Sequence, residues 1–244
     1  MKKLQALFLV FMLVVLCANP ALASSNKNEF DEILKSKDVI QDVLPDSIYD
    51  KYVNDNNVDR FGNIGIEAIV DYYLYVPIFN QGDSRWKNDI MLPDGYTIGA
   101  KGCALTSTAM VFKYFGVNTD PGVLNQEMGD AACPFNWWAA PSRAGHGMVE
   151  LLTVRGDSNQ TEIPLVEFYN IAVAALEDGN PVIIGMVKPN GGTHFVTVKA
   201  VYGDGVTPDD YTVNDPAGGV VRKLDYYIED LGWYIYRIVV YGRI

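Results

Sequence analysis

The hydrophobic pattern divides the chain into an apolar leader, a polar stretch and a longer region of alternating apolar segments and turns. Residues 4–18 are apolar apart from one glutamine. Residues 24–70 are polar and charged, with only weak periodicity. From residue 71 onward, helix-like and strand-like patterns follow one another, and the segment is long enough to bury a core. One folded domain is therefore expected over residues 71–244.

The central helix of this domain is predicted to begin at Cys103 and to end at Gly116, a residue type that favours helix C-termini. Leu105, Ala109 and Phe112 fall on one stripe, so that face is expected to be buried. Unpaired N–H groups and the helix dipole favour an anion at the first turn. The position therefore favours a thiolate and makes Cys103 a candidate nucleophile. The alternative is an inert core cysteine, because free cysteines are among the most buried residues.

Two further helices and a set of strands complete the predicted domain. Asp120–Pro121 is typical of a helix start, and Pro164 opens a helix that runs to Leu176. Residues 148–154 are expected to form a helical turn or two, and residues 129–147 to be irregular. Strands are predicted, from their β-branched and aromatic content, over residues 181–187, 193–202, 210–215 and 232–241. A helical half followed by an antiparallel sheet makes an α+β domain.

The apolar leader has the features of a secretory signal peptide. Two lysines precede the apolar run, and Ala21-Leu22-Ala23 is a small-x-small cleavage sequence. We expect residues 1–23 to be removed by cleavage after Ala23, and the product to be secreted and extracellular. Residues 24–70 are then an N-terminal arm: a pro-segment, a linker or part of the fold. The apolar run is too short to span a bilayer, so no stable membrane insertion is expected.

The net charge and the numbers of histidine and cysteine residues argue against several classes of ligand. The formal net charge is −11, which argues against nucleic acid and anionic lipid as partners. Two histidines and three cysteines offer no spacing for a structural zinc site, and we expect no metal and no cofactor. A monomer is expected. Beyond the leader only Cys103 and Cys133 remain, and a disulfide between them is the main rival to a catalytic Cys103.

His194 is a candidate base for the thiol, because it lies on the apolar face of its strand but at the strand's start, where a cleft can open. If this strand and the next form a hairpin, Asp215 lies within a residue or two of His194 across the pair. A carboxylate there fixes the imidazole tautomer and stabilises its charged form. Taken alone, a structural histidine and a turn-forming aspartate are the alternatives. Asn214 is a second candidate orienter, and His146, between two glycines in a loop, is the other possible base.

Several short motifs follow one another in a fixed order between about residues 75 and 220. They are Val76-Pro77, Asn80-Gln81, Arg85-Trp86, Gly102–Ser107, Thr193–Phe195 and Asn214–Pro216. In this order they resemble the C39-like cysteine peptidase family, which implies a papain-like fold. The resemblance implies that Cys103 is the nucleophile, His194 the base and Asp215 the orienter, and that Gln81 helps to form the oxyanion hole. Family members at the head of bacteriocin exporters continue into membrane and ATPase domains, so this chain resembles the stand-alone branch.

We therefore expect a secreted cysteine hydrolase that cleaves peptide or related amide bonds. Its partner is a peptide or protein substrate, with cell-wall peptide among the candidates. One alternative is an inactive binding module of the same fold, in which Cys103 and Cys133 are joined. Another is a cell-wall peptide amidase or transferase with the same triad. Both stay open, because a fold and a triad do not determine the acceptor.

Overall fold

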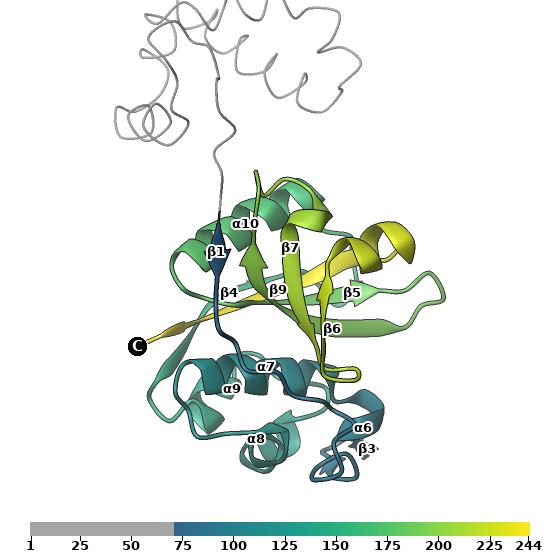
Figure 1. Cartoon of the computed structure of the whole chain (residues 1–244). Coiled ribbons are helices and arrows are strands. Elements are labelled where there is room, and N and C mark those ends of the chain that lie inside the picture. Colours follow the sequence, from purple (N-terminus) through teal and green to yellow (C-terminus); the bar gives the residue numbers. More distant parts are fainter. Residues whose placement is uncertain (1–70) are drawn as a thin grey trace, which may run out of the picture. The chain divides into compact units, whose positions relative to one another are not determined.

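The computed structural model describes residues 71–244, which form one unit built around an antiparallel sheet (Figure 1). The predicted signal peptide, its cleavage site and the arm over residues 24–70 lie outside the described residues. The strands of the main sheet are β1 (Tyr72–Tyr73), β4 (Val149–Arg155), β5 (Val182–Val187), β6 (Thr193–Val201), β7 (Tyr211–Asp215), β8 (Val220–Lys223) and β9 (Tyr234–Arg243). They run in the order β4-β9-β5-β6-β7-β8, and β1 pairs with β6. A small separate sheet pairs β2 (Ile90–Met91) with β3 (Tyr96–Thr97).

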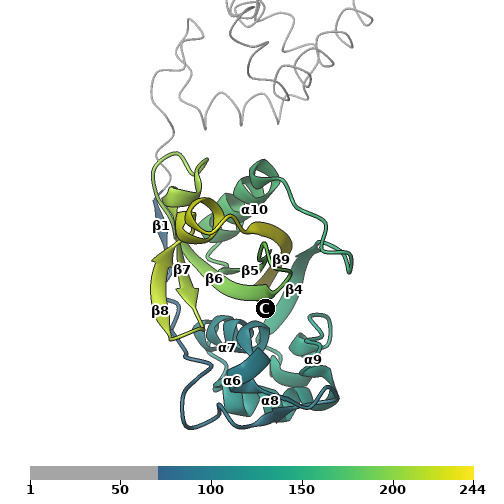
Figure 2. The same cartoon turned by 90° about the vertical axis from the view of Figure 1, so that its right-hand side faces the viewer.

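The helices cover both faces of the main sheet. The α-helices are α6 (Ile98–Lys101), α7 (Cys103–Tyr114), α8 (Pro121–Met128), α9 (Ala140–Ala144) and α10 (Leu165–Glu177). Shorter helical turns are η1 (Gly129–Ala131), η2 (Pro208–Asp210) and the π-helix η3 (Tyr226–Asp230). Helices α6 to α9 lie on one side of the sheet and α10 on the other (Figures 1 and 2). No helix among residues 71–244 is long and apolar enough to cross a membrane.

Two hydrophobic cores result, one on each face of the sheet. Phe112, Trp137 and Phe195 belong to the core beneath α7 to α9. Val196 and other strand residues belong to the core beneath α10. Neighbouring residues of β6 therefore enter opposite cores, which explains why almost the whole strand is buried. Burying one aliphatic or aromatic side chain stabilises the fold by roughly 1.5–3 kcal/mol. The many buried side chains of the central strands therefore keep the ends of these strands in fixed positions.

Most predicted elements are confirmed. Helices begin at Cys103, Pro121 and Leu165, and the Asp120 carboxylate accepts a hydrogen bond from the Val123 N–H as a cap, 2.9 Å away. The α+β class is also confirmed. Residues predicted to be irregular after residue 129 contain the short elements η1 and α9.

The helical prediction for residues 148–154 is wrong. This segment is strand β4, which pairs antiparallel with β9 at the edge of the sheet. A short apolar run of this kind has no decisive period of its own, and helix and strand are hard to distinguish from such a run. The open edge of β9 decides the outcome, because its unpaired backbone groups bind those of β4.

Candidate active site

Cys103 is the first residue of α7, and its position depends on the residue before it. A Cβ atom at Gly102 would lie 2.5 Å from the carbonyl oxygen of Ile98. Only glycine therefore lets α6 turn directly into α7 at this point. Gly102 also supplies no side-chain cap, so N–H groups of the first turn are available to an anion. The half-buried Cys103 side chain is thus the first side chain of α7, beside these N–H groups.

His194 and Asp215 come together because β6 and β7 pair antiparallel, as predicted. The register pairs Thr197 with Asn214, which places Asp215 near the start of β6. His194 Nε2 lies 2.7 Å from Asp215 Oδ1. Both residues are buried, with 8% and 4% of their surface exposed. A hydrogen-bonded pair at this depth has a defined geometry.

The Asp215 carboxylate has further partners that hold it in place. Oδ1 also accepts a hydrogen bond from the backbone N–H of Ala217 at 2.7 Å. Oδ2 accepts one from the Tyr227 hydroxyl at 2.5 Å. Arg222 Nε lies 3.7 Å from Oδ2. Sequence reasoning missed Tyr227, and its place among the aromatic residues of η3 carries no signal that would have revealed it.

The pKa values of the pair shift in opposite directions. Burial is the largest effect on His194 and lowers its pKa, but interactions with Asp215 and Cys103 outweigh it and raise the pKa to about 9. Burial likewise raises the pKa of Asp215, but hydrogen bonds from His194, Tyr227 and Ala217 lower it below its ordinary value. At neutral pH the pair is therefore an imidazolium and a carboxylate.

The ring of His194 interacts with Cys103 and packs among aromatic side chains. Its Nε2 is taken by Asp215, so Nδ1 is the nitrogen left for the Cys103 sulfur, with which the ring interacts. The Trp233 ring stands edge-on to it, with centroids 6.1 Å apart. The Tyr227 ring lies 6.3 Å away on a tilted plane. These contacts restrict rotation of the imidazole.

Gln81, which lies before α6 in the chain, is hydrogen-bonded to the residue after Asp215 and to a residue of α6. Its backbone N–H donates to the carbonyl oxygen of Pro216, 2.9 Å away and one residue after Asp215. Its side-chain Nε2 donates to the carbonyl oxygen of Gly99 at 3.0 Å. An amide nitrogen carries two hydrogens, so one is left after the bond to Gly99.

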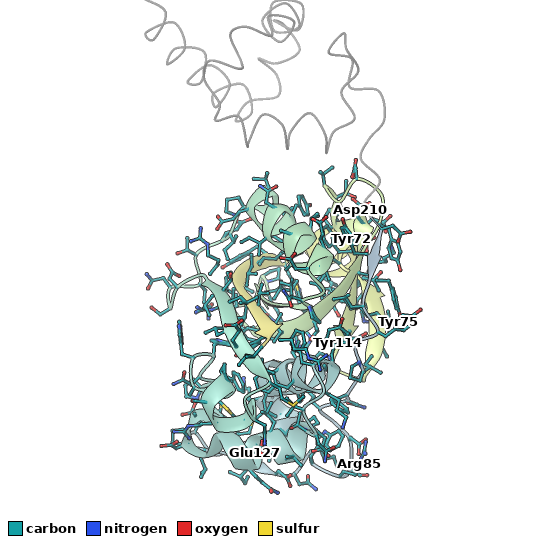
Figure 3. All side chains as sticks on the ribbon, turned by 90° about the vertical axis from the view of Figure 1, so that its left-hand side faces the viewer. Tyr72, Tyr75, Arg85, Tyr114, Glu127 and Asp210 are labelled. Atoms are coloured by element: carbon teal, nitrogen blue, oxygen red, sulfur yellow. The ribbon has the colours of Figure 1, made fainter. Side chains whose placement is uncertain are left out.

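The two alternative candidates, Asn214 and His146, have other hydrogen-bond partners. The Asn214 amide donates to the backbone oxygen of Val76, 3.0 Å away, instead of to His194. His146 Nε2 lies 2.9 Å from Glu127 Oε1, and Figure 3 places Glu127 among the helices on the side of the sheet opposite α10. Asp215, and not Asn214, is therefore the hydrogen-bond partner of His194, and His146, the other candidate base, is paired with Glu127.

The two cysteines beyond the leader are free thiols in the structure. Burial is the main reason that the pKa of Cys133 is raised, and its neighbour Asp94, whose Oδ2 lies 3.8 Å from the sulfur, adds to the effect. Within the described part of the chain, no cluster of three or more potential metal ligands occurs. The Cys103 sulfur is thus not part of a disulfide.

The His194–Asp215 pair predicts a pH dependence of folding stability. A histidine with a raised pKa stabilises the fold fully below its ordinary 6.5, and this contribution is lost as the pH rises through about 9. The lowered pKa of Asp215 gives a contribution present above its ordinary 3.8 and lost at lower pH. The pair should therefore contribute most between about pH 4 and 6.5, by on the order of 2–3 kcal/mol.

Urea unfolding of the wild type and of His194→Ala across pH 4–9.5 measures this contribution. The difference between the two free energies of unfolding should shrink between about pH 6.5 and 9. A difference that is constant over this interval would contradict the raised pKa of His194.

Taken together, the site holds a half-buried thiol at a helix start, and an imidazole that interacts with it and is hydrogen-bonded to a buried carboxylate. The side-chain amide of Gln81, bonded to Gly99 of α6, adds a further donor. This set of groups is suited to nucleophilic attack on a carbonyl carbon. Comparison with models of known protein families gives a match to the family described as Peptidase C39 like, over residues 73–237. The matched range includes all four predicted site residues. No curated protein matches the chain in a comparison of sequences.

Proposed function

Because the chain belongs to the Peptidase C39-like family, we propose that it is a cysteine hydrolase that cleaves peptide or related amide bonds. The family supports a peptidase-type activity. The observation that carries the finer assignment is the 2.7 Å hydrogen bond between His194 and Asp215, in a buried pair whose histidine interacts with Cys103. The proposed roles are nucleophile for Cys103, acid and base for His194, and orienter for Asp215.

In the first half of the proposed reaction, the Cys103 thiolate attacks the carbonyl carbon of the substrate amide. A carbon–sulfur bond forms, and the carbonyl oxygen becomes an oxyanion. The His194 imidazolium then gives its proton to the amide nitrogen, which leaves as an amine and leaves a thioester on Cys103. Asp215 keeps the imidazole in the required tautomer throughout.

In the second half, water replaces the amine. His194, now neutral, takes a proton from the water as the oxygen attacks the thioester carbon. Collapse of the second tetrahedral intermediate releases a carboxylic acid and restores Cys103 with its proton shared with His194. No group beyond this chain and water is needed for the atoms and charges to balance.

The fold is proposed to be papain-like. Its support is the arrangement of the site: the nucleophile begins a buried helix, α7, and the histidine and aspartate come from paired strands of an antiparallel sheet packed on that helix. Thr197 of β6 donates a hydrogen bond to the carbonyl oxygen of Ser107 in α7, 3.3 Å away. Helix and sheet are thus joined directly beside the site.

Gln81→Ala tests the oxyanion role of the side-chain amide. We expect kcat to fall about 10²- to 10³-fold, because one preorganised donor to the developing oxyanion is lost, while KM changes little. Steady-state kinetics on one cleavable peptide measures both constants. The variant also loses the hydrogen bond to Gly99, so its melting temperature is recorded as a control for folding. An unchanged kcat in a folded variant would exclude Gln81 from the oxyanion hole.

Incubation with a mixed peptide library tests the proposed activity as a whole. New N-termini identified by mass spectrometry should appear with the native protein and disappear after alkylation with iodoacetamide. Cleavage that survives complete alkylation would count against a thiol nucleophile. Cell-wall peptides belong in the library, since the triad does not determine the acceptor.

Export is a separate part of the proposal, supported by the leader sequence alone. The mature protein is expected to begin at Ser24 and to be found outside the cell. The intact mass of protein recovered from the culture medium tests this expectation. Light scattering of the same sample tests the expected monomer.

A further inference from the structure

Tyr227 is a buried polar residue that the proposed reaction does not yet use. Only 1% of its surface is exposed, and its hydroxyl donates a 2.5 Å hydrogen bond to Asp215 Oδ2. A buried hydroxyl and a buried carboxylate both lose free energy unless each has a partner. The contact satisfies both groups at once.

The two carboxylate oxygens of Asp215 have different hydrogen-bond partners. Oδ1 accepts hydrogen bonds from His194 and from the backbone of Ala217. At Oδ2, Arg222 Nε is 3.7 Å away, too far for a hydrogen bond, and this nitrogen has no hydrogen-bond partner. Among side chains of the described residues, Tyr227 is therefore the hydrogen-bond donor to Oδ2.

Tyr227 itself is held from several sides. Its backbone N–H donates to the carbonyl oxygen of Leu224 at 3.0 Å, and its own carbonyl oxygen accepts from the Trp233 N–H at 2.9 Å. Its ring packs against the Trp233 ring, with centroids 5.2 Å apart. Trp233 in turn stands against His194. The hydroxyl is thus aimed at Asp215 by a fixed backbone and a packed ring.

We infer that Tyr227 is a positioning residue of the proposed active site, which keeps Asp215 ionised and directs its Oδ1 toward His194. The inference rests on the proposed function for its kinetic consequences. A hydrogen bond to the ionised form of a carboxyl group favours that form. Without the hydroxyl, Asp215 would take up a proton at higher pH and would then stop stabilising the imidazolium.

Tyr227→Phe removes the hydroxyl and keeps the ring. We expect kcat to fall about tenfold, the usual loss for one hydrogen bond to a charged group, with KM little changed. The acidic limb of the pH–rate profile should move to higher pH, because the hydrogen bond lowers the pKa of Asp215. Tyr226→Phe, one residue away in the same helix, is the matched control and should leave the profile unchanged. An acidic limb that stays in place in Tyr227→Phe would overturn the inference.

A second variant keeps the test decisive if Tyr227→Phe does not fold. Site-specific incorporation of 3-fluorotyrosine at position 227 retains the hydroxyl and makes it a stronger donor. The acidic limb should then move to lower pH, opposite to the shift in Tyr227→Phe. A purely structural role predicts no shift with the fluorinated residue, and that result would also overturn the inference.

Titration of His194 by NMR separates this inference from the proposed function. The chain has two histidines, and His146→Ala assigns their ring resonances. The His194 resonance should show a low-pH step as Asp215 takes up a proton, and this step should move to higher pH in Tyr227→Phe. If the wild type cleaves no peptide, the proposed function fails, but a shifted step would still support the role of Tyr227.

Discussion

Replacing Cys103 with alanine is expected to abolish peptide cleavage, with kcat reduced on the order of 10⁴- to 10⁶-fold. Alanine cannot form the thioester, so the reaction loses its nucleophile. The remaining groups still bind the substrate, and KM or the dissociation constant of the peptide should change little. Because the side chain is half-buried at the first turn of α7, removing one sulfur atom should leave the helix intact.

Cys133→Ala is the matched control for this experiment. Cys133 is also half-buried and is also a free thiol, but its sulfur faces Asp94. We expect this variant to cleave at the wild-type rate. Equal, non-zero cleavage by Cys103→Ala and the wild type would exclude Cys103 as nucleophile. A wild type that resists alkylation until reductant is added would instead favour the disulfide-linked binding module.

Replacing His194 with alanine is expected to reduce kcat by a similar factor, on the order of 10⁴-fold or more. The variant loses the proton donor for the leaving amine and the base for the attacking water. It also loses the positive charge beside Cys103. Alkylation of Cys103 by iodoacetamide at pH 7 should therefore become slower, because the imidazolium no longer stabilises the thiolate. Rates of cleavage and alkylation, measured on the same samples, report the two roles separately.

His146→Ala is the matched control, since it removes the other histidine of the chain. His146 is paired with Glu127 and half exposed, so cleavage and alkylation should stay at wild-type rates. If cleavage is instead lost in His146→Ala and kept in His194→Ala, the base has been assigned to the wrong histidine. In that case the hydrogen bond between His194 and Asp215 would be purely structural.

The sequence alone determined the helix start at Cys103 and the strands that carry His194 and Asp215. These features depend on local rules: a glycine before the helix, an alternating apolar strand and a proline after Asp215. The predicted hairpin, which places Asp215 within a residue or two of His194, is also confirmed, because strand length and turn position largely determine a strand register. The catalytic roles themselves stay predictions, which the variants of Cys103 and His194 test.

The tertiary structure decided the features that depend on distant partners. Residues 149–155 became a strand because the edge of β9 was free to pair. Tyr227 became a partner of Asp215 because η3 brings its hydroxyl to the end of β7. Thr197 of β6 is buried where α7 packs on the strand, and its hydroxyl donates to the carbonyl oxygen of Ser107. For β4 and for Thr197 the deciding contact joins residues far apart in sequence, and local propensity carries no information about such contacts.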